Sequence, residues 1–114
     1  MVLTRDFKET VTERIKREPA FAKALLDEAV SLFLNEEPIA ARLVLRDLVN
    51  ATIGFEQLAA ETGTPAKSLH RMLSERGNPG MDNLAAILGA VQRTLKVQIH
   101  TETVGKRSKG KKAS

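Results

Sequence analysis

Residues 54–84 read GFEQLAAETGTPAKSLHRMLSERGNPGMDNL, and this stretch decides the fold that we expect. Two segments of it, residues 55–62 and 66–76, carry apolar side chains at the i, i+3, i+4 spacing of helices that share a core. These side chains are Phe55, Leu58 and Ala59 in the first segment and Leu69, Met72 and Leu73 in the second. The stretch therefore predicts two short helices that pack against each other.

A sharp turn separates the two expected helices. Gly63 stands at this turn, where a residue that is free to adopt a positive φ is favoured. Two helices joined at a steep angle by a short glycine-containing turn form a helix-turn-helix, which we place at about residues 55–76. The outward positions of its second helix are polar and none is acidic: Lys67, Ser68, His70, Arg71 and Ser74.

This stretch resembles the helix-turn-helix of the phage-repressor (XRE-like) family, with the turn glycine and the apolar Leu69 in register. A longer span, about residues 5–95, resembles a bacterial group of addiction-module antidote proteins, similar to HigA-type antitoxins. Residues 43–63 (LVLRDLVNATIGFEQLAAETG) and 68–79 (SLHRMLSERGNP) carry most of this resemblance. It implies a DNA-binding protein that acts as the antitoxin of a toxin–antitoxin pair and represses its own operon.

The rest of the chain predicts an all-α fold of about six helices in one domain, residues 1–104. We expect four further helices: one ending near Arg17, one from Pro19 to Asn35, one from about Pro38 to Gly54, and one from about Met81 to Thr94. On the third helix of the chain, the residues expected to face inward are Ile39, Leu43, Leu45, Leu48, Val49 and Thr52.

Beyond the last helix, apolar or β-branched residues alternate with polar ones from Leu95 to Thr103, which predicts a single half-buried β-strand. A lone strand in a helical chain needs a partner, so we expect it to pair either with its copy in a homodimer or with another protein. Pairing with its two-fold copy would bury Val97 and Ile99, which are therefore the candidate dimerisation residues. The tail, residues 105–114, contains only lysine, arginine and small residues, so we expect it to be disordered.

Charge is segregated along the sequence. Residues 27–61 contain seven acidic residues against two basic ones, whereas residues 62–104 contain five basic against three acidic. The tail adds five basic residues and no acidic one. Such segregation suggests two partners of opposite charge, although solvated faces explain it equally well.

The basic second helix of the motif suggests binding to double-stranded DNA. Entering a major groove with its N-terminus first, this helix would present its outward residues to base edges, and Arg71 suits bidentate recognition of guanine. Thr64 could cap the helix and approach a phosphate. The alternative is a helical hairpin whose polar side is merely solvated. The candidate DNA-binding residues are Thr64, Lys67, Ser68, His70, Arg71, Ser74, Arg76 and Asn78.

Other classes of function find little support in the sequence. The two histidines, His70 and His100, fall on different elements, and the chain has no cysteine to complete a metal or nucleophile site. Glycine-rich phosphate-binding loops are absent, and no apolar run is long enough to span a membrane. We therefore expect a cytoplasmic protein that is not an enzyme and uses no cofactor or metal.

If the antitoxin resemblance holds, the partner protein would be a RelE-like ribonuclease toxin. Such a toxin binds a polyanion and tends to be basic, so it would meet the acidic part of this chain. The candidate partner-binding residues are Glu36, Glu37, Glu56 and Glu61. Two alternatives stay open: a stand-alone transcriptional regulator without a toxin, and a helix-turn-helix that binds only proteins.

Overall fold

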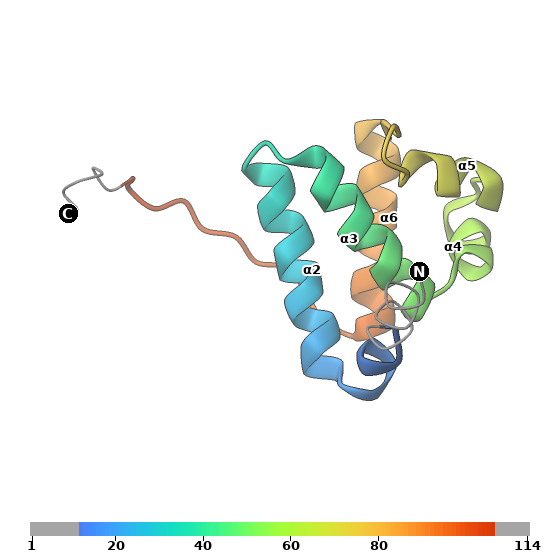
Figure 1. Cartoon of the computed structure of the whole chain (residues 1–114), viewed down its shortest axis with the longest axis horizontal. Coiled ribbons are helices and arrows are strands. Elements are labelled where there is room, and N and C mark those ends of the chain that lie inside the picture. The colour runs from blue at the N-terminus through green and yellow to red at the C-terminus, as the bar shows by residue number, and fades with distance from the viewer. Residues whose placement is uncertain (1–11, 107–114) are drawn as a thin grey trace, which may run out of the picture.

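The computed structural model describes residues 12–106, and helices make up most of this part of the chain (Figure 1). No β-strand occurs among these residues, so the predicted all-α class is confirmed at this level. Residues 12–17 are helical and precede five labelled helices: α2 (Pro19–Leu34), α3 (Pro38–Ala51), α4 (Phe55–Thr62), α5 (Ala66–Met72) and α6 (Met81–Leu95).

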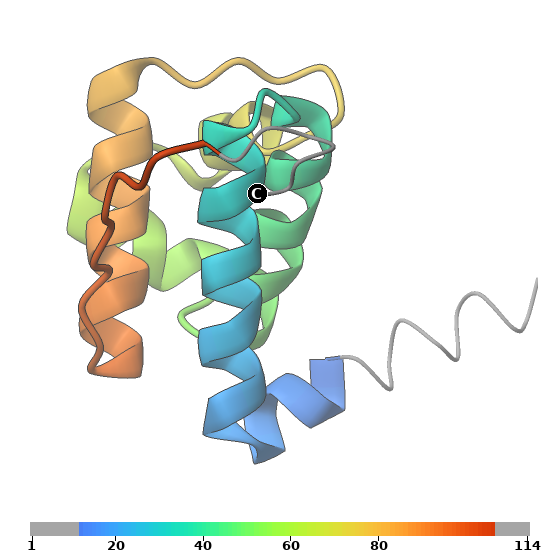
Figure 2. The ribbon, with the colours of Figure 1, turned by 90° about the vertical axis from the view of Figure 1, so that its left-hand side faces the viewer.

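The long helices α2, α3 and α6 form one side of the molecule, and the short helices α4 and α5 form the other (Figures 1 and 2). Helix α3 packs along α2, and α4 packs against both α5 and α6. The apolar side chains of all five helices meet in one core. Its fully buried large residues are Leu26, Leu45, Leu48, Val49, Leu58, Leu69, Leu73, Ile87 and Val91.

Several helix boundaries agree with the expectations from sequence. Pro19 and Pro38 occupy the first positions of α2 and α3, where the missing amide hydrogen leaves no intrahelical bond unmade. Asn35 is the C-cap of α2, and its side-chain amide donates to the carbonyl of Ser31 at 2.7 Å. Gly54, however, does not close α3 as expected: α3 ends at Ala51 with Thr52 as its C-cap, and Gly54, with φ of 82°, is the N-cap of α4.

The inward face predicted for α3 is wrong in its first half. The side chains of Ile39 and Leu43 are 51% and 37% exposed, whereas Ala41 and Arg42 are buried. The N-terminal half of α3 carries apolar residues on more than one side, so periodicity alone could not choose between them. Packing against α2 covers the side that contains Ala41, Leu45 and Leu48.

Helices α2 and α6 end in the same type of turn, although neither has the usual glycine. Glu36 and Lys96 adopt positive φ angles of 64° and 59°. In each case the amide of the following residue bonds back across the last helical turn: Glu37 N to Leu32 O at 2.9 Å, and Val97 N to Gln92 O at 3.0 Å. This pattern is the Schellman motif, in which a left-handed residue satisfies the last carbonyls of a helix.

The segment after α6 starts later than the predicted strand and forms no strand in the described part of the chain. Leu95 belongs to α6, and residues 97–106 have no regular secondary structure. Val97 and Ile99 are half-buried against the chain's own core, and Ile99 N donates to Gln92 Oε1 at 2.7 Å. The expected alternation of half-buried and exposed residues is present up to His100, but pairing with a second chain stays a prediction. Most of the predicted disordered tail, residues 107–114, lies outside the described residues.

No helix within residues 12–106 combines the length and the apolar character that crossing a bilayer requires.

The left-handed residue at the end of α6 provides a stability test. Lys96→Gly should be more stable than Lys96→Ala by about 1 kcal/mol, because a side chain with a Cβ atom is strained at positive φ. Both variants lose the lysine charge, so the comparison isolates the backbone term. Urea unfolding of the two variants measures this difference, and equal midpoints would show that position 96 is not strained.

Candidate nucleic-acid interface

Helices α4 and α5 are joined by the short turn that the sequence predicts. Gly63 adopts a left-handed conformation with φ of 74°, and its amide donates to the carbonyl of Ala59 at 2.9 Å. A Cβ atom at position 63 would meet nothing within 4 Å, so glycine is favoured there by backbone conformation and not by lack of space. Figure 1 shows α4 almost end-on and α5 running across the page, so the two helices cross steeply.

The buried side of α5 consists of Leu69 with the adjoining Leu73, which are 1% and 0% exposed. Lys67, His70 and Arg71 are exposed on the same helix, and Ser68 is half-buried. No carboxylate occurs between Ala66 and Met72. The structure therefore gives α5 an outward face that is polar or cationic along its whole length.

His70 does not project freely from this face. Its ring stacks on the ring of Phe55, the first residue of α4, with centroids 3.9 Å apart and planes 20° apart. Stacking of this kind contributes about 0.5–1.5 kcal/mol beyond the buried area. His70 thus helps to hold α5 against α4, which restricts the ring positions available for contact with a ligand. The role of Phe55 in placing His70 was not anticipated from sequence.

Two of the sequence-predicted residues have structural roles that differ from those expected. Pro65, and not Thr64, is the N-cap of α5, and no side chain caps this helix. The prediction that Thr64 caps α5 is therefore wrong, because the chain enters the helix one residue later. The hydroxyl of Ser74 donates to the carbonyl of Arg71 at 2.7 Å, so it closes the end of α5.

The C-terminal end of α5 is fixed by Arg42, a residue of α3 that sequence reasoning did not select. Its side chain is buried, with the residue 8% exposed. Nε donates to the carbonyl of Ser74 at 2.9 Å, and a terminal guanidinium nitrogen donates to the carbonyl of Glu75 at 2.7 Å. A cation at the C-terminal end of a helix also interacts favourably with the helix dipole. The signal in the sequence was the position of Arg42, three residues before Leu45 and seven before Val49, which places it on the buried side of α3.

In the loop after α5, the backbone of Gly77 lies very close to the last backbone carbonyl groups of α5. A Cβ atom at Gly77 would overlap the backbone carbonyl groups of Arg71 and Met72, so no larger residue fits without a shift of the loop. Gly77 N also donates to the carbonyl of Ser74 at 3.0 Å. The path from α5 to α6 is therefore set by Gly77 together with Arg42.

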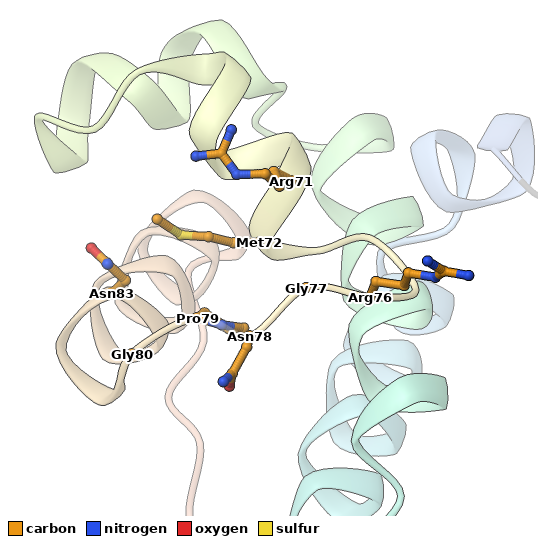
Figure 3. A pocket seen from close by; sticks show the side chains of 8 residues that line it. All are labelled: Arg71, Met72, Arg76, Gly77, Asn78, Pro79, Gly80 and Asn83. Atoms are coloured by element: carbon orange, nitrogen blue, oxygen red, sulfur yellow. The ribbon is translucent and has the colours of Figure 1, made fainter.

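A shallow pocket of about 320 Å³ lies between this loop, α5 and the start of α6. Figure 3 shows Arg71, Met72 and Asn83 extending on the same side of the loop, whereas Arg76 and Asn78 point away from them. The pocket therefore does not bring both arginines to one point. Arg76 and Asn78 are exposed on the loop, where they extend the polar surface beyond α5.

The four glutamates predicted to bind a partner protein do not form one patch. Glu36 and Glu37 lie in the turn between α2 and α3, and Glu56 and Glu61 lie on α4, on the opposite side of the molecule (Figure 1). Glu61 also pairs with Arg93 of α6 at 3.3 Å. Among the described residues, no three His, Asp or Glu side chains come together in a group that could hold a metal ion.

Comparison of the sequence with models of known protein families gives no match, and no curated protein or solved structure matches the chain either. The resemblance to helix-turn-helix antitoxins therefore rests on the residues quoted for it, and its functional content is a proposal.

The buried guanidinium of Arg42 can be tested directly. Arg42→Met should lower the free energy of unfolding by about 1–3 kcal/mol, because two carbonyl oxygens lose their donor. Arg42→Lys should recover only part of this loss, since an ammonium group cannot reproduce the fork of a guanidinium. Arg46→Met, one turn further along α3, is the control. Chemical unfolding that shows no difference between the Arg42 and Arg46 variants would contradict the anchoring role.

Proposed function

We propose that this protein binds double-stranded DNA sequence-specifically, with α5 in the major groove. The observation that carries the proposal is the outward face of α5, where Lys67, His70 and Arg71 are exposed and no carboxylate interrupts them. Arg42 and Gly77 support it, because they hold the C-terminal end of α5 in one position. Direct reading of bases requires a helix whose position is fixed.

The exposed side chains suggest separate roles in such a complex. Arg71 carries an exposed guanidinium fork that matches the two acceptors of guanine, and Lys67 reaches an acceptor from the preceding turn. Arg76 and Asn78, on the loop after α5, suit phosphates that flank the groove. Thr64, just before α5, suits a phosphate at the opposite end of the helix. Ser68 and Ser74 contribute less, since one is half-buried and the hydroxyl of the other is already bonded within the chain.

We further propose that two copies associate through the segment after α6. Val97 N and Ile99 N are bonded to Gln92, so that edge of the extended chain is used within the molecule. The amides of Gln98, His100 and Glu102 belong to the other edge and make no hydrogen bond with the rest of the described chain. Pairing of this edge with its two-fold copy would satisfy these amides and place two α5 helices on one dimer. Helix-turn-helix dimers read half-sites roughly 34–36 Å apart.

The biological role that we propose is that of an antitoxin that also represses its own operon, with a RelE-like ribonuclease as the toxin. The support is the resemblance stated for residues 43–63 and 68–79, together with exposed acidic side chains that suit a basic partner. The alternative is a transcriptional regulator that acts alone. Co-purification with the product of the neighbouring gene distinguishes the two, because only an antitoxin would retain a small basic ribonuclease.

The groove assignment leads to a prediction for Arg71. Arg71→Ala should weaken binding to the duplex upstream of its own coding sequence by about 1–3 kcal/mol and reduce the preference at one base pair. Gel shifts at fixed salt, with a scrambled duplex as competitor, measure both quantities. Arg17→Ala, which removes an exposed arginine near the start of α2, should have a much smaller effect. Unchanged affinity and preference in Arg71→Ala would refute the assignment.

The dimer proposal leads to a prediction for His100. His100→Pro removes one amide from the edge that is formed by Gln98, His100 and Glu102. It should convert dimers to monomers, because proline cannot donate a hydrogen bond to a neighbouring strand. Thr101→Pro introduces the same ring at a residue whose amide belongs to the edge of Val97 and Ile99, which the dimer does not use. This variant should leave the dimer intact. Sedimentation of both variants tests this difference. Loss of the dimer in both variants, or in neither, would count against pairing through this edge.

A further inference from the structure

The turn between α2 and α3 exposes three large aliphatic side chains. Leu34, Ile39 and Leu43 are 68%, 51% and 37% exposed. A shallow groove of about 500 Å³ lies beside them, and its lining consists of Glu36, Glu37, Pro38, Ile39, Ala40 and Leu43. We call this surface the α2–α3 groove. It lies at the α2–α3 turn, away from α4 (Figure 1), and none of its lining residues is among the proposed DNA contacts.

Residues 101–106, which we call the C-terminal arm, leave the body of the molecule on this same side. Figure 1 shows the arm emerging behind α2 and continuing away from it. All six residues are exposed, and they make no hydrogen bond with the other described residues. Val104 is 70% exposed. The arm is thus an exposed segment with one apolar residue and no hydrogen bond to the rest of the described chain.

The arm and the groove are complementary in chemistry. Val104 is the apolar residue of the arm, and Lys106 begins the run KRSKGKKAS, in which five of the nine residues are basic and none is acidic. The groove pairs aliphatic side chains with the exposed carboxylates of Glu36 and Glu37. A segment of this composition would cover the exposed aliphatic surface and place its cations beside the two glutamates.

We propose that the C-terminal arm of one chain lies in the α2–α3 groove of a second copy of this chain, with Val104 against Ile39 and Leu43. A second copy is favoured over the same chain because the arm runs away from its own body (Figure 1). The groove and the arm lie on one side of the molecule. In a two-fold symmetric dimer, the arm of each chain could therefore bind in the groove of the other chain. The inference extends the dimer of the proposed function and does not depend on DNA binding.

The absence of cysteine allows a clean cross-linking test. Leu43→Cys in one chain and Val104→Cys in another are mixed without DNA, allowed to exchange and oxidised. The disulfide-linked heterodimer is identified by the mass of its joined peptides. An arm held in the groove raises the local thiol concentration, so this pair should cross-link about ten-fold more than the control pair. The control replaces Leu43→Cys with Ala60→Cys, at an exposed alanine on α4.

Each outcome decides the proposal. Preferential heterodimers of the Leu43→Cys and Val104→Cys chains support it, whereas equal yields from the test pair and the control pair overturn it. A chain with both substitutions that closes on itself, when the mixed chains do not join, would show that the arm occupies its own groove, which also overturns it. If sedimentation shows dimers but the preferential cross-link is absent, the dimer of the proposed function stands and the placement of the arm in the groove is rejected.

A charge test uses the same preparation. Glu36→Lys with Glu37→Lys in the Leu43→Cys chain should reduce the heterodimer yield several-fold at low salt, because like charges would then face each other. Glu56→Lys on α4 is the matched control. An undiminished yield from the doubly reversed chain would reject the electrostatic part of the contact.

Discussion

The guanidinium of Arg42 sets the position of α5, and the proposed DNA-reading surface depends on it. Burial of a cation is costly unless its donors are satisfied. Here two of its nitrogen atoms donate to the carbonyls of Ser74 and Glu75, directly beyond the end of α5. Helix α5 has seven residues, too few to be stable alone. It is held by Leu69 and Leu73 in the core and by Arg42 at its C-terminal end.

The same constraint shapes the loop that follows. Gly77 lies so close to the last carbonyls of α5 that a side chain there would overlap them. Arg42 binds the same region from the side of α3. The C-terminal end of α5 is therefore connected both to α3 and to the loop that leads to α6. The ring of His70, which stacks on Phe55, also connects α5 to α4. A change in α3 can thus alter α5 without touching its exposed face.

The molecule also divides its exposed features between two sides. Helix α5, which carries the exposed cationic side chains, lies on one side, and the C-terminal arm leaves the molecule on the other (Figures 1 and 2). This division gives the segregated charge of the sequence a spatial meaning, although Glu56 and Glu61 on α4 do not follow it. Self-association on the arm side would leave the α5 face accessible. Binding to DNA and binding to a second chain are therefore compatible in this arrangement.

The features that the sequence predicted correctly depend on local signals. The apolar spacing of residues 55–76 predicted α4 and α5, although α5 ends at Met72 and not near Arg76. The position of Gly63 predicted the turn, and Pro19, Asn35 and Pro38 marked helix ends. Each of these depends on the backbone preferences of a few neighbouring residues. Ile39 and Leu43 were predicted to be buried but are exposed, because α3 has apolar residues on several sides and only packing decides which are buried. Thr64 was misplaced by one residue as a cap, within the usual uncertainty of helix ends.

The sequence by itself determined the helical class, the two short helices around Gly63 and a second helix without acidic residues. These follow from spacing and residue type along a continuous stretch. Only the tertiary structure decided that Arg42 anchors α5, that His70 stacks on Phe55, and that Val97 and Ile99 pack on the chain's own core. Arg42 and the carbonyl of Ser74 are 32 residues apart. No local preference encodes such a contact, because it exists only when α3 and the end of α5 are brought together by the shared core.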